Sequence, residues 1–292
     1  MQHFLRITLF VIMIHTGLTC SFLSAAEPHP SYKRIISLYP AHTENLTALG
    51  VTQELIGISA SDTFPPEILS KQRFSHRDNA EKFIAASPDL VLIRPMIARA
   101  APELINQLKG AGITVISLQP RSVEEMYDYW LELGHLTQRD IKASQIITLF
   151  KQELVTIEKE INKIPLKNRP RVYFESIHSK MKTFSPTSIA IFALEQAGGI
   201  NIAANTKPRR NTNIAAYGKE RILSHAEEID IFLAQQGRMN RISTEQIAKE
   251  PGFMAIKAIR ENKIFLVDEQ LVSRPTQRIL EGIKQIRTIL YQ

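Results

Sequence analysis

Cysteine is almost absent from this chain. The single cysteine among the 292 residues is Cys20, which lies in an apolar stretch near the N-terminus. Residues 21–292 contain no thiol, so this part of the chain forms no disulfide, holds no metal through thiolate ligands and uses no cysteine nucleophile.

Long hydrophobic runs are also missing, because no segment approaches the 18 apolar residues of a membrane-spanning helix. The apolar run Ile7–Ile14 follows Arg6 and precedes the small residues Ser24-Ala25-Ala26. A charged start, a short apolar core and small residues at the end are typical of a secretory signal. We therefore predict a cleaved signal peptide over residues 1–26 and a periplasmic mature protein.

A lipid anchor at Cys20 is the alternative for this segment. The preceding residues Gly17-Leu18-Thr19 lack the small side chain usually found directly before a lipidated cysteine. We therefore expect a cleaved chain without an anchor.

Acidic residues are in the minority, with 29 Asp and Glu against 36 Lys and Arg and a net charge of +7. No arginine-rich arm, zinc finger or aromatic RNA-binding motif accompanies this charge, so we expect no nucleic-acid partner. A basic cleft for an anionic ligand is favoured instead. The chain also lacks a Gly-x-Ser-x-Gly elbow and a Walker loop, which argues against a secreted two-lobed α/β enzyme and predicts no catalytic residue.

The middle of the chain carries one helical stripe. Its apolar residues are spaced 3-4-3-4-3: Ile147, Phe150, Leu154, Ile157, Ile161 and Ile164. This spacing predicts a helix over residues 138–163, ended by Pro165, that would reach roughly 39 Å. A coiled-coil segment or an ordinary core helix is the alternative. Because similar strand–helix patterns flank both sides, we interpret the helix as a strut between two lobes.

The N-terminal lobe is expected over residues 33–136. Its predicted strands cover residues 34–38, 55–58, 90–93 and 113–118, and helices alternate with them. Thr43 is the expected N-cap of a helix over residues 45–49. Alternation of this kind predicts an α/β lobe with a parallel sheet, whose ligands gather at the carboxyl ends of the strands.

The C-terminal lobe is expected over residues 170–292, with the same order of elements. Its predicted strands cover residues 171–174, 229–233 and 263–267. A short pattern recurs in both lobes: Glu81-Lys82-Phe83-Ile84 precedes the strand Asp89–Leu92, and Glu220-Arg221-Ile222-Leu223 precedes Glu228–Ile231, each by eight residues. The recurrence supports two lobes of one design.

These residues together resemble the helical-backbone periplasmic binding proteins of ABC importers, the family that includes ferric siderophore, haem and cobalamin receptors. The matching segments are RIISLYPAHTENLTALG at 34–50, LIGIS at 55–59, SPDLVLI at 87–93, LKGAGITVISL at 108–118, PGFMAIKAIRENKIFLVD at 251–268 and SRPTQRILEGI at 273–283. The family's first motif, Ser-x-x-Pro-x-x-Thr-Glu, is intact as Ser37, Pro40, Thr43 and Glu44. The resemblance implies a class III fold, in which one long backbone helix joins two Rossmann-like lobes.

The resemblance also implies a function. Such a protein captures a metal chelate between its lobes and delivers it to an inner-membrane ABC permease dimer with its ATPase. It acts as a monomer and needs no cofactor. In this family a glutamate of each lobe docks on the permease, and the matching positions here are Glu81 and Glu220. The alternative for both is a helix N-terminal acid stabilised by the helix dipole.

Loops at the strand ends supply the candidate ligand-binding residues: Tyr39, His42, Arg73, Arg77, Arg94, His178, Arg209 and Arg274. A guanidinium grips carboxylate or catecholate oxygens with paired hydrogen bonds, so the arginines favour a ferric siderophore, with a corrinoid next. Arg94 and Arg274 are the preferred pair. For any single arginine, a solvated loop charge is the alternative.

Two further alternatives concern metals. Tyr39 could stack on a ligand, ligate haem iron or simply pack at the floor of the cleft. His42, His76 and His178 could hold a bare zinc or manganese ion, as relatives of this fold do. A metal site needs three or four convergent ligands, and no close histidine pair is present, so we predict no metal site.

Overall fold

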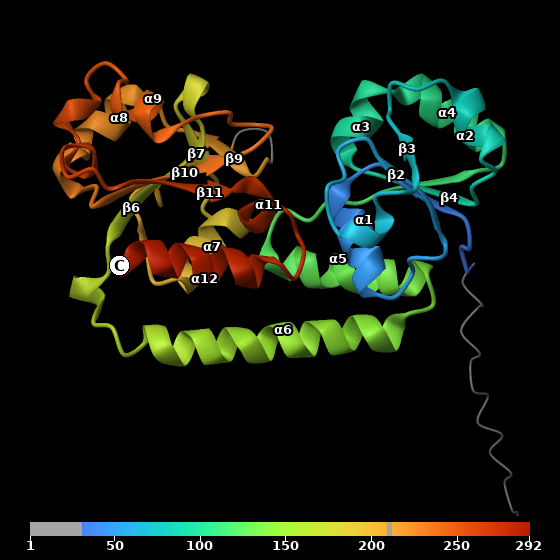
Figure 1. Ribbon diagram of the computed structural model, residues 1–292, viewed down its shortest axis with the longest axis horizontal. Coiled ribbons are helices and arrows are strands. Elements are labelled where there is room, and N and C mark those ends of the chain that lie inside the picture. Colours follow the sequence, from blue (N-terminus) through green and yellow to red (C-terminus); the bar gives the residue numbers. More distant parts are fainter. Residues whose placement is uncertain (1–30, 209–211) are drawn as a thin grey trace, which may run out of the picture.

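Two α/β halves lie side by side above one long helix. The computed structural model describes residues 31–208 and 212–292. The predicted signal peptide and Arg209 lie outside these residues. Each half has its own β-sheet, and Figure 1 shows helix α6 running beneath both of them.

The N-terminal sheet has five parallel strands in the order β3-β2-β1-β4-β5. Its strands are β1 (Ile35–Ser37), β2 (Leu55–Ser59), β3 (Gln72–Phe74), β4 (Leu90–Ile93) and β5 (Thr114–Ser117). Its helices are α1 (Pro40–Ala48), α2 (Ala80–Ala85), α3 (Pro95–Ala100), α4 (Pro102–Gly110) and α5 (Val123–Leu136). The sequence pattern predicted four of these strands and missed β3, which is short and contributes only one buried side chain.

The C-terminal sheet follows the order β11-β10-β6-β7-β9, and β8 pairs with β6. Its strands are β6 (Arg171–Ile177), β7 (Lys182–Phe184), β8 (Ile200–Asn201), β9 (Ile214–Ala216), β10 (Ile231–Gln236) and β11 (Ile264–Asp268). Its helices are α7 (Ile189–Gln196), α8 (Lys219–Ser224), α9 (Thr244–Ala248), α10 (Lys257–Arg260), α11 (Glu269–Val272) and α12 (Ile279–Leu290).

The two sheets match only in part. Strands β6, β10 and β11 pair in parallel, as β1, β4 and β5 do in the other half. Strands β7 and β9 pair in the antiparallel direction. The expectation that the second half simply repeats the first is therefore wrong at this edge. Strand β7 follows β6 after a short turn at Met181, whose backbone is left-handed with φ of 45°, and no crossover helix fits between them.

Helix α6 (Asp140–Ile161) connects the halves. It is two residues shorter at each end than the predicted range of 138–163. Gln138 adopts a left-handed backbone with φ of 55° in the turn between α5 and α6, and this conformation prevents α6 from starting before it. Its N-terminal part packs against α5, and its C-terminal part packs against α7 and α12. None of the helices in the described ranges is long and apolar enough to cross a membrane.

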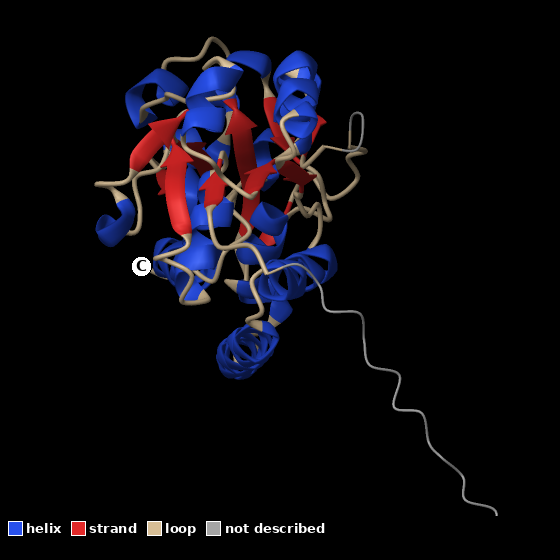
Figure 2. Cartoon of the chain, turned by 90° about the vertical axis from the view of Figure 1, so that its right-hand side faces the viewer, coloured by secondary structure: helices blue, strands red, loops and turns tan. Residues whose placement is uncertain are grey.

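The core explains why the halves are held together. Successive residues of each central strand point to opposite faces, so Ile35 packs on the α6 side and Ile36 on the other. The apolar cluster on the α6 side is continuous, and it includes Trp130 of α5, Phe150 of α6 and Ile283 of α12. The outer faces have separate clusters, one per half. Figure 2 shows the strands enclosed between helices, with one helix below them.

Helix α1 begins earlier than predicted. It runs from Pro40, and Tyr39 occupies the N-cap position without a side-chain cap. Thr43 is therefore not an N-cap; its hydroxyl donates to Ser37 Oγ at 2.8 Å and to Asp62 Oδ2 at 3.2 Å. Proline at the first helical position is favourable because its missing N–H would have no partner there.

Candidate ligand-binding cleft

Two adjoining cavities open between the halves, one of about 900 Å³ and one of about 370 Å³. They share Tyr39 and Arg94 from the N-terminal half, and Met239 and Ser273 from the C-terminal half. The larger volume lies within the range of small-molecule sites in proteins. The cleft is therefore one space divided by side chains from both sides.

Tyr39 and Arg94 form the centre of the N-terminal wall. They follow β1 and β4, which are neighbours in the sheet, so the two side chains meet at the carboxyl edge of the strands. The Arg94 guanidinium lies over the Tyr39 ring, 4.9 Å from its centroid. Burial raises the pKa of the Tyr39 hydroxyl, which is therefore neutral at ordinary pH. Sequence reasoning named both residues, and the structure brings them together.

His42 lies behind Tyr39, with ring centroids 5.1 Å apart. Its side chain is fully buried, and it lines neither cavity. Its Nε2 is 2.9 Å from the Ile93 carbonyl oxygen, which can only accept, so Nε2 carries the hydrogen. Its Nδ1 then accepts from the Tyr129 hydroxyl at 2.7 Å. The expectation that His42 contacts a ligand does not fit this burial, because both of its nitrogens are already satisfied by the protein.

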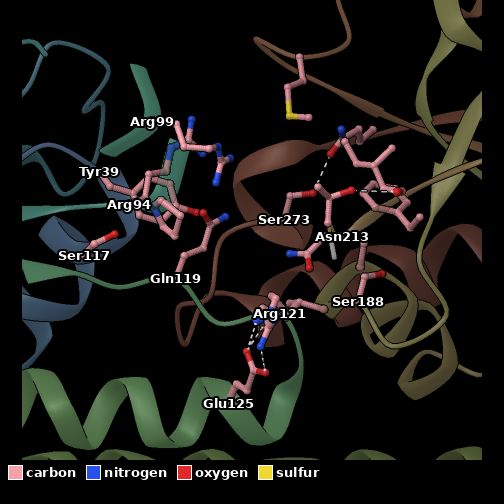
Figure 3. A pocket seen from close by; sticks show the side chains of 18 residues that line it. Tyr39, Arg94, Arg99, Ser117, Gln119, Arg121, Glu125, Ser188, Asn213 and Ser273 are labelled. Carbon is pink, nitrogen blue, oxygen red and sulfur yellow. Dashed lines mark hydrogen bonds and ion pairs between the residues drawn. The ribbon is translucent and has the colours of Figure 1, made fainter. Parts of the chain in front are cut away.

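The end of β5 and the loop after it contribute residues that the sequence analysis did not select. Ser117, Gln119 and Arg121 line the larger cavity, together with Glu125 at the start of α5 (Figure 3). Ser122 caps α5 by accepting from the Glu125 backbone N–H. The sequence could have indicated these residues, because they stand at the carboxyl end of a predicted strand, as the selected residues do.

The C-terminal wall is less charged. Ser188 and Asn213 face the larger cavity opposite Tyr39, as Figure 3 shows, and Phe184 adds an aromatic surface. Ser273 donates to Gln235 Oε1 at 2.7 Å, and the Gln235 amide donates to the Ser176 carbonyl at 2.9 Å. Neutral hydrogen-bonding groups therefore face the arginines across the cleft.

Five of the described arginines line the cavities, and they fall into two groups. Arg121 is paired with Glu125 in two contacts of 3.0 and 3.3 Å, and Arg274 is paired with Glu44 at 2.5 Å. Arg94, Arg99 and Arg238 form no ion pair with any carboxylate among residues 31–208 and 212–292. Within the described ranges, these three guanidinium groups are the cleft cations that lack an ion-pair partner.

Two of the predicted arginines lie elsewhere. Arg73 is on the edge strand β3, and its Nη1 donates to the Asp62 carbonyl at 3.0 Å and to that of Ser59 at 3.4 Å. Arg77 is exposed on the following turn. Neither lines a cavity. Arg209, which falls outside the described ranges, is not placed.

His178 also lies away from both cavities. Its Nδ1 is 3.0 Å from the buried Glu175 carboxylate, and its Nε2 is 3.5 Å from Glu250. The hydrogen bond to Glu175 raises the pKa of His178. Lys219 pairs with Glu250 at 2.6 Å and completes the cluster. The structure therefore places this histidine in an internal ion-pair network beneath α8.

Glu81 and Glu220 occupy equivalent places in the two halves. Each is exposed in the first turn of its helix, α2 or α8, and these helices precede the equivalent strands β4 and β10. Figure 1 shows both helices on the side of the molecule opposite α6. Over the described residues, neither carboxylate takes part in an ion pair.

Metal ligands do not gather in the cleft. Across residues 31–208 and 212–292, no group of three or more His, Cys, Asp or Glu side chains is placed to hold a metal ion. Of the three histidines that a bare-ion site would use, His76 lines the smaller cavity, whereas His42 and His178 lie in separate halves with their own partners.

Comparison with known proteins agrees with this architecture. A family model described as periplasmic binding protein matches residues 35–271. An uncharacterized ABC transporter substrate-binding lipoprotein, YvrC of Bacillus subtilis, is 26% identical over 89% of this chain and 80% of its own length. The vitamin B12-binding protein of Vibrio cholerae is 25% identical over 94% of this chain and 96% of its own. A solved structure from Staphylococcus epidermidis, titled a possible iron-binding (periplasmic solute-binding) protein, has a TM-score of 0.76 and 30% identity over 90% of this chain and all of that one.

The chain belongs to the periplasmic binding protein family. Its two α/β halves and single long connecting helix are the class III form of that fold, as the resemblance implied.

Proposed function

We propose that this protein is the substrate-binding protein of an ABC importer and that it captures an anionic metal chelate in the cleft. A ferric siderophore is the first candidate and a corrinoid the second. The protein binds its cargo unchanged and hands it to a permease dimer with its ATPase. The observation that carries the proposal is a cleft of ligand size, made of the two adjoining cavities, into which three guanidinium groups without an ion-pair partner among the described residues project: Arg94 and Arg99 line the larger cavity, and Arg94 and Arg238 line the smaller one.

The charge pattern supports an anion. Arg94 and Arg99 approach from α3, and Arg238 approaches from the opposite half. A ligand with negative charge at more than one place would satisfy all three, and charge-assisted hydrogen bonds to guanidinium are among the stronger polar contacts. Glu269 lines the smaller cavity, and its negative charge would repel an anionic ligand there. Its Oε2, however, already accepts a hydrogen bond from the Met239 backbone at 3.1 Å.

The names of relatives support a metal chelate. They include a vitamin B12-binding protein and a possible iron-binding protein. An iron chelate and a corrinoid are both larger than the ions that a compact three-ligand site would hold, and the volume of about 900 Å³ suits a ligand of that kind. We rank a siderophore ahead of a corrinoid because arginines outnumber aromatic side chains in the lining of the larger cavity, where the aromatic residues are Tyr39 and Phe184.

Delivery to a permease is the second part of the proposal. Glu81 and Glu220 are exposed, unpaired within the described residues, and equivalent in the two halves. Two separated carboxylates fix the orientation of a partner that carries matching cations, and such charges mainly set specificity and association rate. The signal peptide predicted over residues 1–26 would place the mature chain in the periplasm, where it would meet such a permease.

Ligand titration tests the proposal. The purified protein would be titrated by calorimetry with a ferric tris-catecholate, a ferric tris-hydroxamate, haem, cyanocobalamin and zinc chloride. We expect micromolar or tighter binding of an anionic ferric chelate, one molecule per chain, and recovery of the chelate unchanged. Tight binding of zinc with no chelate bound would instead indicate a bare-ion receptor, and turnover of a bound compound would indicate an enzyme.

A further inference from the structure

The segment 273–278, which joins α11 to α12, fastens the C-terminal half to the N-terminal half. The Pro275 carbonyl accepts from Asn45 Nδ2 at 2.9 Å and from Trp130 Nε1 at 3.0 Å. Gln277 Nε2 donates to Asn45 Oδ1 at 3.1 Å. Both acceptors and donors are buried or partly buried, so this joint lies at the base of the cleft between the halves.

An ion pair lies directly beside this joint. Arg274 Nη1 is 2.5 Å from Glu44 Oε1, and Arg278 Nη1 is 3.7 Å from Glu44 Oε2. The side chains of Glu44 and Arg274 are only 3% and 12% exposed. Glu44 belongs to α1 of the N-terminal half, and both arginines belong to the C-terminal half. A charge buried to this degree is strongly unfavourable without its partner.

This geometry gives Arg274 a different task from the other cleft arginines. It lines the smaller cavity, but its positive charge is already matched by a buried carboxylate. A ligand could draw on that charge only in competition with Glu44. Arg94, Arg99 and Arg238 have no such competitor in the part of the chain that the structure describes.

We propose that Glu44 and Arg274 form a latch that sets the angle between the two halves, and that Arg274 is a positioning residue for the ligand-binding arginines. Arg94 and Arg238 come from opposite halves, so the distance between them depends on that angle. The ion pair sits at the base of the cleft, and Thr63 Oγ1 donates to Gln270 Oε1 at 2.9 Å as a further, exposed link between the halves. Removing either partner would leave the other charge desolvated, and this cost is relieved if the halves move apart and admit water.

The near absence of cysteine allows a direct test by pulsed electron spin resonance. Spin labels at N106C on α4 and K249C beside α9, in a C20S background, would report the distribution of distances between the halves; both labelled positions are exposed. The measurement is made without ligand. Its result is therefore independent of the proposed function, although the role of the latch in binding rests on that function.

We expect the parent to give a narrow distribution and E44Q and R274M each to give one at least twofold broader or shifted to longer distance. The double variant should be no broader than R274M alone, because the two residues act through one contact. R274K, which keeps a cation, should be closer to the parent. E160Q is the matched control, since it removes an exposed ion pair between Glu160 of α6 and Arg287 of α12 within the same framework.

A merely structural role predicts a different result. In that case E44Q would lower the melting temperature while the folded protein kept the parental distance distribution, and this outcome would overturn the proposal. If E44Q does not fold, R274M, which removes the other partner of the same ion pair, takes its place. An unchanged distribution in R274M then counts equally against the latch.

Discussion

Arg94 and Tyr39, which follow neighbouring parallel strands, stack at the centre of the cleft with 4.9 Å between the guanidinium carbon and the ring centroid. The stack orients a cation that has no carboxylate partner among the described residues. Cation–π contacts of this kind contribute about 0.5–2 kcal/mol and hold the guanidinium plane in one direction. An arginine prepared in this way loses little side-chain freedom when an anionic ligand binds.

Replacing Arg94 by alanine should therefore weaken ligand binding. We expect the dissociation constant of an anionic ferric chelate to rise about tenfold or more, since a charge-assisted hydrogen bond contributes about 1.5–3 kcal/mol. Calorimetric titration provides the measurement. R77A is the matched control, because Arg77 is exposed and lines neither cavity. Equal losses in the two variants would show that general positive charge, and not this stack, attracts the ligand.

Charge reversal at the two exposed acids should separate delivery from binding. In E81K and E220K we expect the chelate affinity to stay within about twofold, because both side chains lie away from the cavities. Uptake of radiolabelled chelate by cells that depend on this importer should be abolished, since like charges would face each other across the permease contact. E158K on the outer side of α6 serves as the control. Normal uptake by both variants would remove the docking role.

Asp62 should make folding stability fall as the pH rises. This residue is 2% exposed, and burial raises its pKa from 3.8 to about 7. Hydrogen bonds from the Ser59 backbone and Thr43 and the charge of Arg274 lower this pKa, whereas the charge of Glu44 raises it further. Between pH 4 and 7 the folded carboxyl keeps a proton that the unfolded one has lost. This favours folding at acid pH by roughly 4 kcal/mol, and the contribution is lost as the pH approaches 7.

The variant D62N should lack this dependence. We expect its free energy of unfolding, relative to the parent, to increase by several kcal/mol between pH 4.5 and 8. Urea denaturation at a series of pH values gives the comparison. A difference between variant and parent that does not change with pH would mean that Asp62 is ionised throughout this range.

His42 should act in the opposite direction. Burial lowers its pKa from 6.5 to about 4, although the hydrogen bond to the Ile93 carbonyl partly opposes the shift. The folded ring is then neutral between pH 4 and 6.5, where the unfolded ring gains a proton. The stability that this provides is complete above pH 6.5 and is lost on acidification, by roughly 3 kcal/mol in total. The contributions of His42 and Asp62 to folding stability change with pH in opposite directions. Measurements on the parent protein alone would therefore not reveal either contribution.

The imidazole resonances of His42 test this directly. Nitrogen-15 spectra should show a neutral ring protonated at Nε2 down to about pH 4, as the contacts with Ile93 and Tyr129 require. A ring that titrates near pH 6.5 would contradict the burial of this side chain in solution.

Local patterns were sufficient for much of the architecture. The 3-4-3-4-3 spacing from Ile147 to Ile164 predicted α6 to within two residues at each end, because an amphipathic helix records in its own sequence which side is buried. Apolar strands such as Leu90–Ile93 were equally clear. The antiparallel edge of the second sheet was missed, because β7 and β9 have three residues each and their directions depend on pairing with β6 and with β7, respectively.

The site divided along the same line. The sequence determined that arginines and Tyr39 would stand at strand ends, because the position of a residue after a strand is a local property. Only the tertiary structure decided which of them face the cleft: it buried His42 against Tyr129, paired Arg274 with Glu44 from 230 residues away, and left Arg94 unpaired. Burial and ion pairing depend on what the rest of the chain brings alongside a residue, and no local pattern encodes that.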